Sequence, residues 1–281
     1  MMQAQVISAV VNPISKTINC GQKYIFDLEY VTNESLCVSV VNTKDIASFR
    51  KFDNGSFRFF STRASYLCFV RSGGIEYFIF SENGYLYCWK AGSHEQKPVN
   101  YWCLADSELW KGYAPNGIAS CKSGGILVSL WNKQMLERSL GKVIKLSLND
   151  HIIRLEIEID KNRPLFTCPT YITENGNEDV CVSDVNAVVV TDAGGLLRFR
   201  YKGLSDDSQF DPYGICSDSQ NNIIIADMMK NRIHMIDQNG EFLHYIQYRD
   251  MNRPRALCID EDDNLYVGEW SSEEIKVLSR Q

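Results

Sequence analysis

The chain has 281 residues, 44% of them hydrophobic, with a formal net charge of −6 and a sequence pI near 5.3. This length suits one large closed β fold or two ordinary domains, and the apolar content is sufficient for a core. No run of 18 apolar residues occurs, so we expect no membrane span. An acidic chain without a clustered basic face is not typical of a nucleic-acid binder.

The first predicted element is a strand over residues 5–11, a short apolar run broken by Ser8. No basic residue precedes it, which does not fit a secretory signal. We therefore expect a cytoplasmic protein. The strand has no neighbour nearby in the sequence to pair with, so its partner should lie elsewhere in the chain.

Short strands separated by turn residues follow, and they recur at intervals of forty to fifty-odd residues. In the first third of the chain only the second strand of each unit is clear, at 36–39 and 77–80. Fuller copies come next: Pro115-Asn-Gly-Ile precedes Ile126-Leu-Val-Ser, and Pro169-Thr-Tyr-Ile precedes Val180-Cys-Val-Ser at the same distance. The spacing indicates a repeated structural unit.

The repeat is plainest at the end of the chain. Pro212-Tyr-Gly-Ile-Cys-Ser-Asp leads into Asn222-Ile-Ile-Ile-Ala-Asp, and Pro254-Arg-Ala-Leu-Cys-Ile-Asp leads into Asn264-Leu-Tyr-Val-Gly-Glu. In both copies 15 positions separate the proline from the final acidic residue. Units of this length, each built of about four short strands, predict the blades of an all-β propeller.

We predict a single domain over residues 1–281 with six blades. The last unit ends after its third strand and so lacks an outer one. We expect residues 5–11 to supply that strand, which would close the ring and remove an exposed edge. Counting back from the second strands places the unit origins near residues 25, 66, 115, 169, 212 and 254.

Two further patterns concern packing. The second strand ends in a small residue in five of the six units, which predicts close approach of neighbouring backbones: Ser39, Ser129, Ser183, Ala226 and Gly268. Longer intervals predict insertions at 90–113 and 133–140. The alternating stretch 155–160 is expected to be a half-exposed outer strand.

The ten cysteines show no C-x-x-C spacing, so neither a metal site nor a disulfide framework is indicated. Cys216 and Cys258 occupy the same position in two successive repeats, as do Cys37 and Cys181. Cysteine therefore behaves as a small apolar strand residue, and we expect free, buried thiols in a reducing compartment. No cofactor is predicted.

The repeated motifs near the end of the chain resemble a known repeat family. The order P-x-G-I-x-x-D, N-I-I-I-A-D and N-R-I-x-x-I-D-x-x-G within 212–240 resembles the NHL repeat. Residues 165–281 are similar to the C-terminal propeller of invertebrate tripartite-motif (TRIM-NHL) proteins. The resemblance implies a six-bladed NHL propeller that recruits a protein or RNA partner, usually behind a RING, B-boxes and a coiled coil. Ubiquitin ligase activity would need a RING joined to this chain.

Asp227 and Arg232 could be read as a functional acid and base. In the NHL pattern such a pair lies on facing ends of strands two and three, so we interpret it as structural, with the aspartate accepting hydrogen bonds from the turn and the guanidinium. Glu269 and Glu274 take the same places in the last unit, and two carboxylates cannot form that ion pair.

We predict that the chain is not an enzyme. The four histidines lie in unrelated repeat positions, and no catalytic motif is present. A remote alternative is a hydrolase or lyase centred on the channel, as in six-bladed lactonases that use calcium or peptide-amidating lyases that use zinc. The interior first-strand positions are too small and apolar to ligate a hard cation: Ala119, Thr173, Cys216 and Cys258.

A partner site follows from the strand order, because strand one begins and strand two ends on the same face of a blade. We call this face the proline rim. Aromatic, methionine and arginine side chains gathered there are typical of an interface centre. The candidate binding residues are Asn116, Trp131, Thr170, Tyr213, Met228, Lys230, Arg253, Arg255 and Trp270.

We expect this rim to bind a protein, with the propeller itself monomeric. The alternative is RNA binding, in which Lys133, Lys230, Arg253 and Arg255 contact phosphates and Tyr213 stacks on a base. The acidic balance disfavours this alternative, since residues 206–281 carry 15 acidic against 7 basic side chains.

Overall fold

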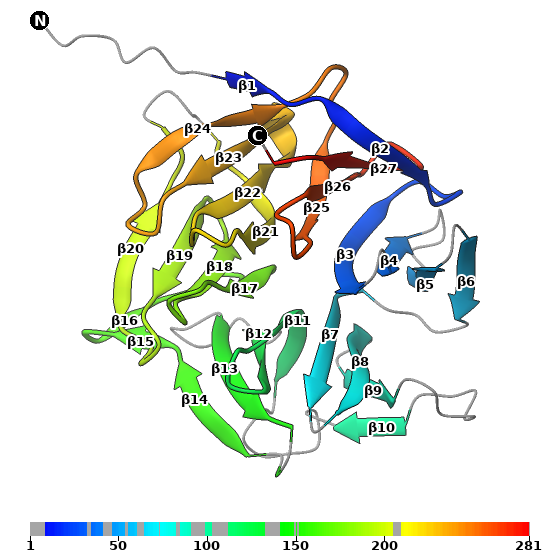
Figure 1. The fold of residues 1–281 in the computed structure, drawn as a ribbon. Coiled ribbons are helices and arrows are strands. Elements are labelled where there is room, and N and C mark those ends of the chain that lie inside the picture. The colour runs from blue at the N-terminus through cyan, green and yellow to red at the C-terminus, as the bar shows by residue number, and fades with distance from the viewer. Residues whose placement is uncertain are drawn as a thin grey trace, which may run out of the picture.

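A computed structural model describes residues 9–32, 35–41, 47–53, 56–60, 65–72, 74–82, 85–90, 99–102, 112–132, 141–148, 150, 152–204 and 209–280. Short twisted sheets are arranged around a central axis (Figure 1). One edge strand of each larger sheet lies nearest the axis, and these inner strands contact one another in a closed cycle. The prediction of an all-β propeller is confirmed.

The described residues form five four-stranded sheets, one five-stranded sheet and a two-stranded hairpin. The first four-stranded sheets in chain order contain β3 (Ile25–Thr32), β4 (Ser35–Val41), β5 (Ala47–Asp53) and β6 (Ser56–Phe60); β7 (Leu67–Ser72), β8 (Ile75–Glu82), β9 (Tyr85–Lys90) and β10 (Val99–Trp102); and β11 (Tyr113–Ser120), β12 (Gly125–Asn132), β13 (Gly141–Ser147) and β14 (Ile153–Ile157). The hairpin is β15 (Ile159–Asp160) and β16 (Arg163–Pro164).

The remaining sheets hold the plainest repeats. They contain β17 (Ile172–Glu174), β18 (Val180–Asp184), β19 (Ala187–Thr191) and β20 (Leu197–Tyr201); β21 (Pro212–Ser217), β22 (Ile223–Asp227), β23 (Arg232–Ile236) and β24 (Phe242–Gln247) with β1 (Ala9–Val11); and β25 (Pro254–Ile259), β26 (Leu265–Glu269) and β27 (Glu274–Leu278) with β2 (Ile14–Asn19). A single 3-10 turn, η3 (Met228–Lys230), joins β22 to β23. The inner strands begin next to the expected unit origins.

The N-terminal segment closes the ring with other residues than we predicted. Residues 5–8 lie outside the described residues, and β1 pairs in parallel with β24, giving that sheet its fifth strand. It is β2 that pairs antiparallel with β27 and completes the last sheet. The prediction that 5–11 fills this place is therefore wrong. Most β2 side chains are exposed, so its sequence carries no apolar signal for a strand.

Small residues at the end of strand two fit narrow wedges between sheets. The three that are serines each donate their hydroxyl to a backbone carbonyl of the next sheet: Ser39 to Ser65 at 2.6 Å, Ser129 to Thr170 at 2.7 Å and Ser183 to Tyr213 at 2.6 Å. At Gly268 the reason is steric, since a Cβ would lie 2.5 Å from Ile25 Cγ2. The small residue thus allows close approach and, where it is serine, adds a hydrogen bond between sheets.

Apolar side chains fill the wedges between adjacent sheets, so the core is distributed around the ring. Of the nine cysteines that the structure describes, all are free thiols and eight are buried. Most of the insertions predicted at 90–113 and 133–140 lies outside the described residues. The stretch predicted as an outer strand is split, because β14 ends at Ile157 and residues 159–160 open the hairpin.

Within the part of the chain that the structure covers, no helix has the length and apolar character to cross a membrane.

Candidate functional site at the channel mouth

Each inner strand begins at the proline rim. There the backbones of neighbouring inner strands approach one another closely around the axis. Gly214 lets β21 meet β25, since a Cβ at this position would lie 2.3 Å from the carbonyl oxygen of Arg255. Gly117 has the same role beside Thr170, where a Cβ would lie 2.0 Å from the carbonyl oxygen. The glycine of the P-x-G motif thus draws the flanking side chains into one cluster.

Arg255 lies at the centre of that cluster. Its guanidinium carbon is 4.2 Å from the ring centroid of Phe26, 4.6 Å from that of Trp270 and 4.7 Å from that of Tyr213. Its Nε donates a hydrogen bond to the Tyr171 hydroxyl at 3.0 Å. Cation–π contacts of this kind favour a positive charge beside the ring faces. The arginine is therefore fixed by rings that come from four different sheets.

The rings are themselves held in place. The Tyr171 hydroxyl donates to the backbone carbonyl of Phe26, and Tyr66 packs edge-on against both rings at centroid distances of 5.1 Å. Trp270 packs on Tyr24 at 5.2 Å. Burial raises the pKa of the Tyr66 and Tyr171 hydroxyls. Both therefore stay neutral hydrogen-bonding groups, and the cluster is preorganised.

Arg255 stays charged in this setting. Burial disfavours its cationic form, but the neighbouring Tyr171 and Tyr66 hydroxyls oppose that effect, and the pKa of the guanidinium is raised from its ordinary value. A buried or half-buried charge is normally balanced by a counter-ion. The cluster is thus a fixed cation framed by aromatic faces.

Below the mouth, the inner strands enclose a channel of about 290 Å³. Asp27 accepts hydrogen bonds from the backbone amides of Leu28 at 3.0 Å and Leu67 at 2.9 Å, and Glu29 accepts one from Phe69 at 3.1 Å. Burial raises the pKa of Asp27 to about 7 and that of Glu29 to about 8. These carboxyl groups tie β3 to β7.

Neither carboxyl group was predicted from the sequence, because interior positions were inferred only from the clearest repeats. The positions inferred in that way do line the channel: Ala119, Thr173, Cys216 and Cys258. Asp27 and Glu29 stand two apart in the diverged first unit. Acidic residues on one face of a strand were the available signal. The description of the channel as small and apolar is therefore corrected.

The predicted rim residues divide into two groups. Tyr213, Arg255 and Trp270 form the cluster at the mouth. Asn116 and Thr170 are used in local hydrogen bonds, the first through Nδ2 to the Pro169 carbonyl and the second through its hydroxyl to the Ser183 carbonyl, both at 3.0 Å.

The other rim residues differ in exposure. Lys230 and Arg253 are exposed, and Trp131 is half-buried at the end of β12. Lys133 lies outside the described residues. Met228 is buried, whereas Met229 is 60% exposed, because the 3-10 turn directs the first methionine inward. Met229 therefore takes the place on the rim that we assigned to Met228.

Asp227 and Arg232 lie at facing ends of β22 and β23. The carboxylate accepts a hydrogen bond from the Lys230 amide at 3.3 Å, and its other oxygen is 3.6 Å from Arg232 Nε. That oxygen is also 3.4 Å from Nε2 of the fully buried His234. From the sequence, His234 was only one of four histidines in unrelated repeat positions, and this contact with Asp227 was not foreseen.

Acidic residues at the position equivalent to Asp227 make similar contacts in two other sheets. Asp184 accepts from the amides of Thr167 and Cys168 at 2.8 and 2.6 Å, and Glu269 accepts from the Asn252 amide at 2.7 Å. Each acidic side chain thus fastens a loop next to its own strand two.

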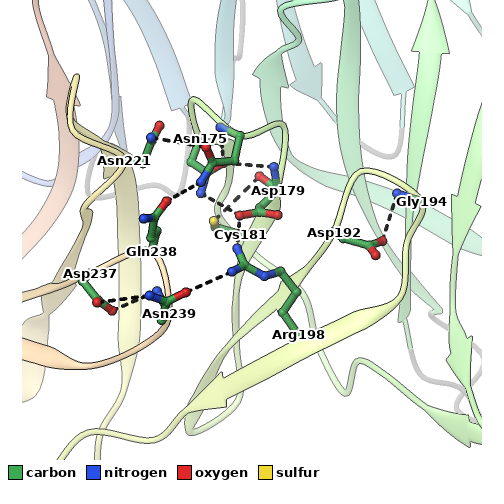
Figure 2. Close-up of polar contacts among 11 residues, drawn as sticks. Asn175, Asp179, Cys181, Asp192, Gly194, Arg198, Asn221, Asp237, Gln238 and Asn239 are labelled. Carbon is green, nitrogen blue, oxygen red and sulfur yellow. Dashed lines mark hydrogen bonds and ion pairs between the residues drawn. The ribbon is translucent and has the colours of Figure 1, made fainter.

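The opposite rim carries a different polar cluster, shown in Figure 2. Arg198 forms an ion pair with the buried Asp179 and donates from Nη2 to Asn239 Oδ1 at 3.2 Å. Asn175 donates from Nδ2 to Asp179 at 3.0 Å. Because the groups satisfy one another across two sheets, this cluster joins the β17–β20 and β21–β24 sheets.

The next question is whether the described residues could bind a metal ion. Among the described residues, no group of three or more histidine, cysteine, aspartate or glutamate side chains is placed to hold a metal ion.

Comparisons with known proteins give the fold and one partial likeness. No family model matches the chain. Protein lin-41 of Caenorhabditis elegans is 31% identical over 85 residues, which is 30% of this chain and only 7% of the length of that protein. This similarity agrees with the TRIM-NHL resemblance over a limited stretch of the chain.

Several solved structures share the architecture. A catalytically inactive virginiamycin B lyase from Staphylococcus aureus with quinupristin has a TM-score of 0.61 at 17% identity, covering 95% of this chain and 88% of that one. A putative gluconolactonase has a TM-score of 0.66 at 16% identity, with 96% and 94% covered. The WD40 propeller domain of Doa1 has a TM-score of 0.60 at 9% identity, with 95% and 97% covered.

These structures correct the prediction that the chain is not an enzyme. That prediction rested on the absence of catalytic motifs, yet propellers of this fold include a lyase and a putative gluconolactonase. At such identities the likeness establishes the fold alone and assigns no reaction.

Proposed function

We propose that the chain is a six-bladed NHL-type propeller that binds a protein partner through its proline rim. The observation that carries this proposal is the set of accessible apolar and aromatic side chains around a fixed arginine at the channel mouth. The NHL-like repeats and the similarity to lin-41 over 85 residues support the family assignment.

The rim has the composition of an interface centre. Met229 and Val185, at the turns after β22 and β18, are 60% and 49% exposed. Trp270 and Tyr213 are half-buried beside Arg255. Aromatic residues, methionine and arginine are enriched where protein interfaces are most buried, and methionine adapts to varied surfaces. A protein surface with an apolar patch would therefore be complementary to this rim.

Within the TRIM-NHL resemblance, this binding recruits a substrate to a ubiquitin ligase. The propeller would hold the substrate while a RING joined to it supplies the ligase activity. The free, buried thiols among the described cysteines suit a reducing compartment, so we place this function in the cytoplasm.

The test compares the two rims. Met229→Asp places a charge on the proline rim, and Leu196→Asp is the matched control on the opposite side, where the native leucine is 63% exposed. In proximity labelling with quantitative mass spectrometry, a defined set of proteins should be lost with Met229→Asp and retained with Leu196→Asp. Equal capture by both variants and by the wild type would contradict the proposal.

RNA binding is the second candidate, favoured by the exposure of Lys230 and Arg253 on the same rim. Phosphate contacts by lysine and arginine give binding a steep salt dependence. Titration with single-stranded RNA at low salt decides this candidate. We expect binding weaker than about micromolar, because a chain with a net charge of −6 repels a polyanion.

A further inference from the structure

Within the described part of the chain, the terminal nitrogens of Arg255 have no protein acceptor. Its Nε is used by the Tyr171 hydroxyl, but no hydrogen bond or ion pair from Nη1 or Nη2 is found among the residues described. Neither nitrogen belongs to the fully buried polar atoms that lack a partner, so both reach solvent. The guanidinium thus presents an open edge with donors in a fixed plane.

Nearby carboxyl groups do not neutralise this charge. Asp27 is close enough to interact electrostatically, but its oxygens accept the amides of Leu28 and Leu67. Asp211 is engaged by the Tyr213 hydroxyl. No carboxylate oxygen in the described residues lies within 4.0 Å of the Arg255 nitrogens. A largely desolvated cation without a counter-ion is unusual in a folded protein and marks a place for a ligand.

We propose that the open edge of Arg255 binds the carboxylate of an acidic side chain on the protein partner. This inference rests on the proposed function and names the chemistry of its central contact. A guanidinium binds a carboxylate through two parallel hydrogen bonds, and such charge-assisted pairs are the strong ones. Phe26, Tyr213 and Trp270 surround the guanidinium and would pack against the methylene stem of the incoming side chain.

A carboxylate fits this site better than a phosphate of RNA. Asp211 places an acidic group near enough to interact electrostatically with the arginine, and it repels a polyanion more strongly than a single carboxylate. Nucleic-acid binding also relies on several phosphate contacts along a backbone, whereas the described residues of the channel mouth include one open guanidinium.

The probe is a random peptide library displayed on phage and selected against the whole chain. We expect selected peptides to carry an acidic residue at one fixed position, flanked by apolar residues. The best peptide is then measured against wild type and Arg255→Lys, with the acidic residue present or changed to its amide. Lysine keeps the charge and the cation–π contacts but loses the planar pair of donors. Each change should weaken binding at least about tenfold, and the two losses should not add.

The outcomes separate this inference from the function on which it rests. If Met229→Asp abolishes peptide binding but no acidic residue is selected, the rim remains the site and the carboxylate contact is rejected. If no peptide binds the rim, both proposals fail. Displacement of the peptide by single-stranded RNA in wild type but not in Arg255→Lys would assign the site to phosphate and overturn the inference. Unchanged melting of Arg255→Lys shows that a loss of binding is not a loss of folding.

Discussion

Two arginines at opposite rims show how the same side chain serves different ends. Arg198 is paired with Asp179 and donates to Asn239, so its charge is used within the fold (Figure 2). Arg255 is fixed by aromatic faces and one tyrosine hydroxyl, and no described residue accepts a hydrogen bond from its terminal donors. The first joins two sheets, whereas the second is the residue to which we assign the partner contact. Under this proposal the propeller is tied together at one rim and binds its partner at the other.

Alanine substitutions at two glycines, one on each rim, should give the largest difference in unfolding free energy. At Gly214 on the proline rim, an added Cβ would meet backbone atoms of Arg255 and Leu257 at 2.3 and 2.8 Å, which cannot move aside. Gly214→Ala should cost about 3 kcal/mol of unfolding free energy. At Gly176 on the opposite rim the atom in the way is Oδ1 of Asn221, the end of a side chain that can rotate. Gly176→Ala should cost less than about 1 kcal/mol, and equal urea-unfolding losses would contradict this account.

The unfolding free energy should fall as the pH rises, because two carboxyl groups are buried in the channel below the mouth. Asp27 and Glu29 have folded-state pKa values raised to about 7 and about 8, so the folded protein holds these protons more tightly than the unfolded chain. Their contribution is fully present below the unfolded values near 4 and is lost as the pH rises through 7 and 8. The unfolding free energy should drop by about 2 kcal/mol between pH 6 and 7, where both groups change their proton binding. Asp27→Asn with Glu29→Gln should flatten this slope, and an unchanged slope would place its origin elsewhere.

The smallest expected difference concerns the arginines themselves. Arg198→Ala leaves the buried Asp179 without its cation, although Asn175 still donates to it, and should cost about 1–2 kcal/mol. Arg255→Lys keeps a cation among the rings and should change stability by less than about 1 kcal/mol. Thermal melting of the two variants checks this order. A reversed order would mean that Arg255 is the structural residue.

Local repeats were enough to predict an all-β propeller. The proline-to-acid spacing and the alternating apolar strands located the inner strands of the later units, since these features are short-range. The closing strand could not be found in this way, because β2 is mostly exposed and its partner β27 lies at the other end of the chain. Its pairing depends on the closure of the ring, which no local pattern records.

The candidate site was only partly visible in the sequence. The strand order brought Tyr213, Arg255 and Trp270 to one rim, but Phe26 and Tyr171 come from distant units and their approach depends on the wedge angles between sheets. The exchange of Met228 for Met229 has a local cause, a single 3-10 turn. Apolar patterning does not decide between two adjacent methionines.

The most direct test of the account is hydrogen–deuterium exchange of the whole chain with and without the selected acidic peptide. Binding should slow exchange at the starts of β21 and β25 and in the turn around Met229, and should leave the turns around Asn175 and Asn239 unchanged. Protection confined to the opposite rim, or equal on both, would contradict the claim that the open arginine marks the recognition face.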